Sequence, residues 1–364
     1  MMEEVSESMN RIISIIMNNL QAISDKAGKQ ITDARAWRGA EIADSDWVTQ
    51  LAGSEVDALH DMAAALPSDE LAWLNFDPGS IKDAAVVDVL QRASTELAQG
   101  KGFVLLRGLD GRDIERLRRI FWIIGNGLGE PVMQNAKGEV LSIVADRFAG
   151  AERGVDTRGY ESNDELRFHC DGGDCIGMSC IRQASVGGTN GVVSLFALYN
   201  EVLASYPQYL DVLMQGYPLY SRKEKGAPES TKNLGKVQPS RMPVFAWHQG
   251  RMSAWLNIKL AELAADVSGQ AFSEVEREAL ACIESVATRP DMQLTFKQEP
   301  GDVLFINNMA VMHRRDKYVD AENETQKRML YRMWINLHKA QPVVAQHAAL
   351  RRGIRGQGPV IAAV

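Results

Sequence analysis

The chain has 364 residues, of which 45% are hydrophobic and 24% are charged, values that are ordinary for a globular protein with a substantial core. Its formal net charge of −7 argues against a general nucleic-acid binder, which usually carries a basic face. No segment approaches the ~20 apolar residues that span a bilayer, and no basic start or cleavage site indicates a secretory signal. We therefore expect a cytoplasmic protein without membrane or nucleic-acid partners.

The N-terminal quarter of the chain is predicted to be helical. Residues 1–30 form a polar leader that we expect to be flexible or helical. Apolar residues then recur at helical spacing over residues 56–66 and 86–97. Residues 31–100 are thus predicted to be the helical N-terminal part of one large domain, which extends over residues 31–345.

Short strands predominate after this region. Residues 103–107 are typical of a strand, and residues 113–124 of an amphipathic helix. Further strand-like segments, separated by Gly, Pro and Asp turns, cover residues 140–144, 166–169, 178–182, 192–195, 244–247, 252–256, 294–297, 303–307 and 329–337. Two helical stretches, 196–213 and 273–286, interrupt them. This pattern predicts a mainly β fold with flanking helices, in which a jelly-roll core spans residues 101–345 and the N-terminal helices pack on one sheet.

Two polar loops and the C-terminus complete the chain. Residues 147–164 and 222–240 are rich in Gly, Ser, Glu and Lys. Loops of this length are usually lids over a site or disordered segments, and the sequence does not choose between the two. Residues 346–364 are expected to be a solvated or loosely docked tail.

A histidine and an aspartate at the end of one predicted strand indicate a metal site. His169 and Asp171 are two residues apart, and alternate residues of a strand point to the same face, so both side chains can bind one ion. His313, which follows the predicted strand 303–307, is the best candidate for a third ligand. Two imidazoles and one carboxylate form the facial triad of non-haem iron(II) oxygenases. Because a His-x-Asp pair alone is a weak signal, a zinc site with hydrolytic chemistry remains the alternative.

Two arginines strengthen the iron hypothesis. Arg328 and Arg332 are expected to share one face of the apolar strand 329–337 with Leu330 and Trp334. Buried arginines need anionic partners, because an unpaired buried charge costs several kcal/mol. A guanidinium group also matches the shape of a carboxylate. The partner is either a protein carboxylate in a structural salt bridge or the carboxylate of a bound small molecule.

With these motifs the chain resembles the taurine dioxygenase family of iron(II)- and 2-oxoglutarate-dependent oxygenases, within the clavaminate synthase-like superfamily. Six blocks between about Ala36 and His338 carry the resemblance: residues 102–108, 134–139, 165–171, 187–188, 301–308 (leading to His313) and 327–334. The resemblance implies a double-stranded β-helix, cupin-like core. It also implies that His169, Asp171 and His313 bind Fe(II) and form the catalytic centre.

The resemblance implies further roles. Arg328 stands where the family binds the distal carboxylate of 2-oxoglutarate, and Arg332 where it often contacts substrate or co-substrate. Family members place a hydroxyl or an amide near the co-substrate after a glycine pair, which makes Thr189 or Asn190 the candidate here. Asp171 disfavours halogenation, because halogenating relatives replace this carboxylate by a small residue so that chloride can bind.

The resulting hypothesis is an enzyme that hydroxylates an unactivated C–H bond of a small organic substrate. It would consume O2 and convert 2-oxoglutarate to succinate and CO2. The same cofactor could instead support desaturation, epoxidation or ring closure in a biosynthetic pathway. A non-catalytic cupin-like sensor or scaffold is a further alternative, although it would not need a co-substrate anchor such as Arg328. An anionic substrate follows if Arg332 faces it, and a homo-oligomer is compatible with the sequence.

Overall fold

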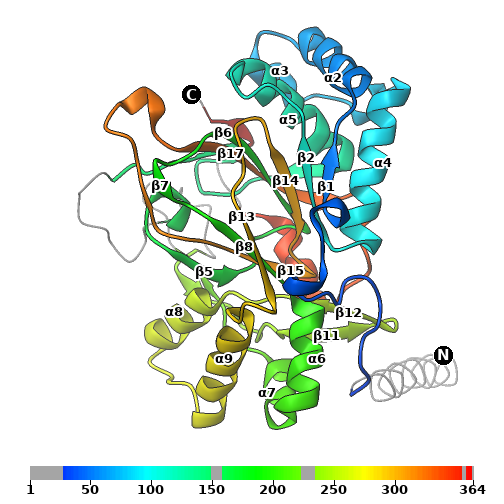
Figure 1. Cartoon of the computed structure of the whole chain (residues 1–364). Coiled ribbons are helices and arrows are strands. Elements are labelled where there is room, and N and C mark those ends of the chain that lie inside the picture. Colours follow the sequence, from blue (N-terminus) through cyan, green and yellow to red (C-terminus); the bar gives the residue numbers. More distant parts are fainter. Residues whose placement is uncertain (1–27, 149–157, 223–233, 355–357, 363–364) are drawn as a thin grey trace, which may run out of the picture.

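The computed structural model describes residues 28–148, 158–222, 234–354 and 358–362. Two β-sheets lie face to face, with helices on the outside (Figure 1). Most of the expected leader, residues 1–30, lies outside the described residues, and so do the central parts of the loops 147–164 and 222–240. The two alternatives for those loops, lid or disordered segment, stay predictions.

The larger sheet has the strand order β1-β2-β14-β6-β17-β4-β18, with β3 also paired to β17. Its strands are β1 (Val48–Gln50), β2 (Phe103–Arg107), β3 (Gly129–Val132), β4 (Glu139–Val144), β6 (Cys175–Arg182), β14 (Val303–Asn307), β17 (Met329–Leu337) and β18 (Val360–Ile361). The central strand β17 pairs antiparallel with β6 on one side and with β4 and β3 on the other. Backbone hydrogen bonds thus hold it on both sides.

The smaller sheet has the order β13-β8-β15-β5 and is antiparallel. Its strands are β5 (Leu166–His169), β8 (Asn190–Ser194), β13 (Gln293–Phe296) and β15 (Val311–Arg315). The remaining strands pair in three two-stranded sheets: β7 (Val186–Gly187) with β16 (Tyr318–Val319), β9 (Tyr220–Ser221) with β10 (Lys236–Val237), and β11 (Phe245–His248) with β12 (Arg251–Ala254).

Helices cover the outer sides of the two sheets. The α-helices are α2 (Gly53–Ala65), α3 (Glu70–Trp73), α4 (Ala84–Gln99), α5 (Ile114–Leu128), α6 (Leu195–Ser205), α7 (Leu210–Gln215), α8 (Ile258–Ser268), α9 (Glu274–Ala287) and α10 (Ala345–Ala348). Short 3-10 turns occur at Gly39–Glu41, Asp44–Asp46, Pro78–Ser80, Gly159–Glu161, Pro207–Tyr209, Glu324–Gln326 and Ala349–Arg352. Helices α2 to α5 lie together on the side of the larger sheet, and α6 to α9 gather at the opposite end (Figure 1). No helix within the described ranges is both long enough and apolar enough to cross a bilayer.

Strand β17 separates two hydrophobic cores because its side chains alternate. Met329, Tyr331, Met333 and Ile335 pack in the core that α4 and α5 share with the larger sheet. Trp334 belongs to the core between the two sheets. The two faces of the strand are therefore divided as predicted, and Arg332 in β17 and Arg328 directly before it point to the space between the sheets.

The jelly roll with flanking helices agrees with the prediction, and the differences have local causes. The expected helix 196–213 is divided into α6 and α7 at Pro207, which starts a 3-10 turn. Helix α8 was not predicted, because its buried face consists of Ile258 and three alanines, a weak hydrophobic pattern. Finally, the described part of the expected C-terminal tail is docked and not solvated: β18 extends the larger sheet as a parallel partner of β4.

Candidate active site

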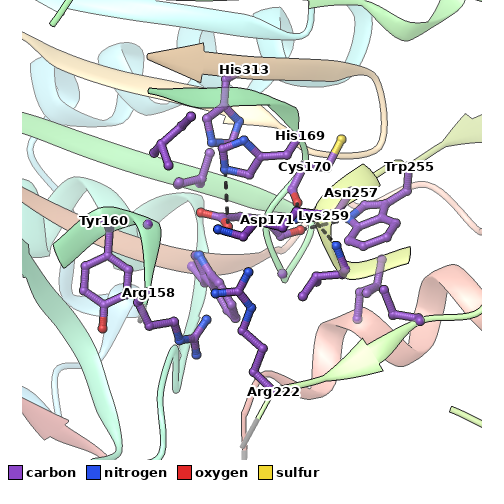
Figure 2. Close-up of a pocket in the computed structure, with 18 of the residues that line it drawn as sticks. Arg158, Tyr160, His169, Cys170, Asp171, Arg222, Trp255, Asn257, Lys259 and His313 are labelled. Atoms are coloured by element: carbon purple, nitrogen blue, oxygen red, sulfur yellow. Dashed lines mark hydrogen bonds and ion pairs between the residues drawn. The ribbon is translucent and has the colours of Figure 1, made fainter. Parts of the chain in front are cut away.

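The structure brings His169, Asp171 and His313 together between the two sheets. Each side chain offers one ligand atom, and these atoms lie within 4.8 Å of one another. The two imidazole centroids are 4.3 Å apart, and His169 Nε2 lies 4.0 Å from Asp171 Oδ1 (Figure 2). Residues 169 and 313 are register partners in the pairing of β5 with β15. Backbone pairing therefore determines the separation of the two histidines.

Hydrogen bonds orient the first two of these residues. His169 Nδ1 lies 2.8 Å from the carbonyl oxygen of Arg167, so a proton on Nδ1 leaves the Nε2 lone pair for a metal. The backbone of Asp171 is held at both ends, because Trp255 Nε1 donates to its carbonyl oxygen over 2.9 Å and its N–H donates to Asn308 Oδ1 over 3.2 Å. These contacts fix the positions of His169 and Asp171 relative to each other.

The charge states of Asp171 and His313 suit metal binding. Burial by itself would raise the pKa of Asp171, but the positive charge of Arg332 and the two nearby imidazoles outweigh it and lower this pKa to about 2. Burial, together with the neighbouring His169, lowers the pKa of His313 to about 3. At neutral pH the site therefore presents an ionised carboxylate and a neutral imidazole, the forms that coordinate metal ions.

Arg332 lies beside the triad and is held by a glutamine. Its Nη1 is 3.3 Å from Asp171 Oδ2, and its Nε donates to Gln134 Oε1 over 2.7 Å. Gln134 in turn donates from Nε2 to the carbonyl oxygen of Arg332 over 2.8 Å. The guanidinium carbon lies 4.1 Å from the centroid of the Tyr160 ring, while Nη2 is buried and makes no hydrogen bond to any described residue. Arg332 thus presents a fixed donor next to the triad.

Arg328 is a buried charge that forms no ion pair with any carboxylate of the described residues. Its exposed fraction is 2%, and neither Nε nor Nη1 has a hydrogen-bond partner among the described residues. The guanidinium carbon lies 5.0 Å from the centroid of the Tyr318 ring. Asp320 instead accepts from the backbone N–H of Arg328 over 2.8 Å. Because an unpaired buried charge is costly, the arrangement fits a site for a small anion.

A cavity of about 880 Å³ joins these groups. The triad, Arg328 and Arg332 line its inner end together with Tyr160, Trp255 and Asn257, and Arg158, Arg222 and Lys259 line it further out (Figure 2). A small organic substrate and the co-substrate fit in this volume together.

The structure places the other candidate residues differently. Asn190 lines the cavity, whereas Thr189 is not among the lining residues. The Thr189 carbonyl oxygen accepts from the backbone N–H of Asp316 over 2.9 Å. Gln134 does not line the cavity and contributes by holding Arg332. Asn190 is therefore the better placed of the two co-substrate candidates.

Residues 345–354 form one wall of the cavity, which the sequence did not indicate. Leu350 lines the cavity, and its carbonyl oxygen accepts from the backbone N–H of Gly173 over 3.1 Å. Arg351 Nε donates to Asp174 Oδ1 over 2.7 Å. The buried imidazole of His347 contacts Ser253 Oγ and the carbonyl oxygen of Pro243, both at 2.8 Å. Contacts with three distant segments thus hold this wall in place. Local sequence patterns in residues 345–354 do not predict these contacts, because the partners lie far away along the chain.

Comparisons with known proteins agree with this architecture. The family model described as taurine catabolism dioxygenase TauD, TfdA family matches residues 72–334. FR-33289 synthase of Streptomyces rubellomurinus is 26% identical over 335 residues, which cover 90% of this chain and 96% of that protein. The taurine hydroxylase-like protein SAT17 of Stachybotrys chartarum is 25% identical over 322 residues, which cover 84% of this chain and 80% of that protein.

Solved structures share the fold at lower identity. The non-haem iron oxygenase OrfP in complex with Fe and L-Arg has a TM-score of 0.59 and 15% identity, with 79% of this chain and 93% of that chain covered. Asparagine oxygenase in complex with Fe(II), hydroxyasparagine and succinate has a TM-score of 0.55 and 15% identity, with 80% and 93% covered. The family match extends over most of the chain, so the chain belongs to the taurine catabolism dioxygenase TauD, TfdA family and is an iron- and 2-oxoglutarate-dependent oxygenase.

Proposed function

We propose that this enzyme hydroxylates a C–H bond of a small anionic molecule at a centre in which His169, Asp171 and His313 bind iron(II). The observation that carries the proposal is the position of Arg328. Its buried guanidinium lines the same cavity as the three ligand candidates and has no salt-bridge partner in the described part of the chain. A metal-binding sensor or scaffold has no need for such a group.

The donor set fits iron. Two imidazoles and one carboxylate occupy one side of an ion and leave coordination positions for a chelating co-substrate and O2. When bound, iron and 2-oxoglutarate supply the oxidation: O2 converts 2-oxoglutarate to succinate and CO2, and its second oxygen atom is inserted into the substrate C–H bond. The protein binds and orients the reactants and excludes water from the cavity.

The two arginines take different partners in this proposal. Arg328 binds the distal carboxylate of 2-oxoglutarate, because it is buried and offers two donors that no described residue uses. Arg332 is already held by Gln134 and Asp171, and its remaining donor Nη2 is available for an anionic group of the substrate. Asn190 contributes a neutral polar group beside the co-substrate.

The wider setting of the enzyme also belongs to this proposal. A cytoplasmic location suits ferrous iron and four cysteines that are all free thiols, since both require reducing conditions. The structures of relatives contain small molecules such as L-Arg, which supports a small-molecule substrate here. Oligomerisation is compatible with the fold and is not required by the site, because the described residues of one chain provide all three ligand candidates.

The test is iron- and 2-oxoglutarate-dependent turnover. Protein prepared under anaerobic conditions should bind one iron(II) per chain and, after O2 is added, convert 2-oxoglutarate to succinate faster when a true substrate is present. With ¹⁸O2, the product should carry one labelled oxygen if the reaction is hydroxylation, and none if it is desaturation or ring closure. Fully loaded enzyme that forms no succinate with any small organic anion would refute the proposal.

A further inference from the structure

The ligand candidate Asp171 is held in a different way from the two histidines. His169 lies in β5 and His313 in β15, and the two residues are register partners, so the pairing of the strands fixes both. Asp171 lies in the turn between the end of β5 and Cys175, the first residue of β6. Because Asp171 lies outside both strands, strand pairing does not determine where its carboxylate points.

The turn that carries Asp171 has little rigidity of its own. Gly172 and Gly173 directly follow Asp171, and glycine has the largest backbone freedom of all residues. Neither position accepts another residue easily: a Cβ atom at Gly172 would lie 2.6 Å from the ring of Trp334, and Gly173 has a φ of +73°. Contacts from outside the turn must therefore hold Asp171 in one position.

Asn308 makes three such contacts. It directly follows β14, and its exposed fraction is 0%. Its Oδ1 accepts from the backbone N–H of Asp171 over 3.2 Å, and its Nδ2 donates to the carbonyl oxygen of Gly172 over 3.1 Å. The backbone N–H of Asn308 donates to the carbonyl oxygen of Asp174 over 2.9 Å. Both polar atoms of the side chain are thus bonded to the backbone of Asp171 and Gly172.

The chemistry of these contacts requires an amide. A backbone N–H and a carbonyl group that are removed from water each need a partner. The side-chain amide of Asn308 supplies an acceptor for the N–H of Asp171 and a donor for the carbonyl group of Gly172. A carboxylate would lack the donor, and an aliphatic side chain would lack both groups. Asn308 therefore provides for Asp171 what a neighbouring strand provides for the histidines.

Two other side chains contact the same turn. Trp255 Nε1 donates to the carbonyl oxygen of Asp171 over 2.9 Å, and Asn257 Nδ2 donates to the carbonyl oxygen of Cys170 over 3.3 Å. Each of these bonds holds one carbonyl group. We therefore expect the loss of Asn308 to weaken metal binding strongly without abolishing it.

We propose that Asn308 is a positioning residue of the metal centre, which fixes the turn so that the carboxylate of Asp171 is in place before a metal binds. The role rests on the function proposed above, in which Asp171 is a ligand of iron(II). Asn308 is not among the described residues that line the cavity, so it acts through Asp171 and not on the substrate. Ordering a flexible turn during binding costs free energy, so a turn that is already ordered binds the metal more tightly.

The neighbouring Asn307 offers a matched control. It is the last residue of β14, and its side chain also makes two hydrogen bonds. Its Nδ2 donates to the carbonyl oxygen of Leu97 over 2.9 Å, and its Oδ1 accepts from the backbone N–H of Met309 over 2.9 Å. Neither partner belongs to the turn of Asp171. Asn307→Ala and Asn308→Ala thus each remove two hydrogen bonds, but only Asn308→Ala releases the turn.

Titration of the metal-free enzyme with Co(II), a visible substitute for iron(II), compares the two variants. Asn308→Ala should raise the Kd for Co(II) by at least about tenfold, the usual effect of losing a contact that orients a metal ligand, and should shift the visible absorption bands of the bound ion. Asn307→Ala should stay within about twofold of the wild type and keep its bands. Both variants should unfold at lower urea concentrations than the wild type, because both lose hydrogen bonds. The same Kd and the same bands in both variants would overturn the role of Asn308.

Hydrogen exchange of the metal-free wild-type enzyme tests the role without a variant. The amide proton of Asp171 should exchange at least about a hundredfold more slowly than in an unstructured peptide, because Asn308 already holds it. Exchange at the unstructured rate, with protection only after Co(II) is added, would contradict the proposal. Wild-type enzyme that binds iron(II) and forms succinate, with an Asn308→Ala variant that binds Co(II) equally well, refutes the positioning role alone. Wild-type enzyme that binds no iron(II) contradicts the proposed function.

Discussion

The inner and outer ends of the cavity are held in place by different kinds of contact. At the inner end, His169 lies in β5, Asp171 two residues further on and His313 in β15, while Arg332 lies in β17 and Arg328 directly before it. The central strand β17 is hydrogen-bonded on both sides. At the outer end, the walls come from α8, the ribbon of β9 and β10, and residues 345–354. Side-chain contacts such as the ion pair of Arg351 with Asp174 hold part of this end.

Because of this difference, we expect the inner end to determine the reaction and the outer end to determine which substrate binds. A paired strand cannot shift without the loss of several backbone hydrogen bonds, so the metal geometry tolerates changes elsewhere in the protein. Walls that depend on a few side-chain contacts can change in shape and charge without disturbing the metal centre. Substitutions at the inner end should therefore affect the reaction, and substitutions at the outer end should affect binding and local stability.

The largest effect is expected for Asp171→Ala at the inner end. Loss of the carboxylate removes one of three ligand candidates, and we expect turnover to fall by at least about a thousandfold and iron affinity to drop. Succinate formation and iron titration measure the two effects. Glu165→Ala removes an exposed carboxylate from the same cavity and should change turnover less than about threefold. Comparable activity in both variants would contradict the metal assignment.

Arg328→Gln should raise the KM for 2-oxoglutarate by about 10- to 100-fold, because it removes a charge-assisted, fork-shaped contact with the co-substrate. Arg328→Lys keeps the positive charge but lacks the planar guanidinium group, so its KM for 2-oxoglutarate should lie between that of Arg328→Gln and that of the wild type. The control is Arg314→Gln, since Arg314 lines the cavity but pairs with Asp316. An unchanged KM for 2-oxoglutarate, with a raised KM for substrate, would reassign Arg328 to the substrate.

His347 makes the outer end sensitive to acid. Burial lowers its pKa to about 4 from an ordinary value of 6.5, so the unfolded chain takes up a proton first as the pH falls. The stability that depends on neutral His347 is therefore complete above about pH 6.5 and is lost as the pH falls toward 4, with a loss of about 2 kcal/mol at pH 5. Urea unfolding at pH 7.5 and pH 5 should show a smaller pH dependence for His347→Gln than for the wild type. The same dependence in both proteins would exclude this role, and His60→Gln on α2 serves as the control.

The smallest effect is expected for Arg351→Gln, which leaves the carboxylate of Asp174 without its ion-pair partner. Because Arg351 is 28% exposed, solvent screening reduces the cost, and we expect the free energy of unfolding to fall by about 1–2 kcal/mol. Arg352→Gln removes the same charge from the exposed neighbouring residue and should leave the unfolding midpoint unchanged. Iron affinity should be unaffected in both variants, and a large loss of iron in Arg351→Gln would show that the two ends are not independent.

The sequence by itself determined the features that depend on local periodicity and on motifs. Alternation along residues 329–337 placed Arg328 and Arg332 on the face opposite to Met333, because side-chain direction in a strand repeats every two residues. The family motifs pointed to His169, Asp171 and His313, which the structure brings within 4.8 Å of one another. Local rules also predicted most strands and helices, and they did not resolve the break at Pro207.

Only the tertiary structure decided which charges have partners and what surrounds the substrate. Arg328 and Arg332 look alike in sequence, yet Arg332 lies beside Asp171, 161 residues earlier, while the guanidinium group of Arg328 forms no ion pair with a described carboxylate. The contact of Arg351 with Asp174 likewise joins residues 177 positions apart. Such pairings depend on how the sheets and the terminal segment pack in space. They cannot be predicted from the spacing of residues along the chain, because the partners are far apart in sequence.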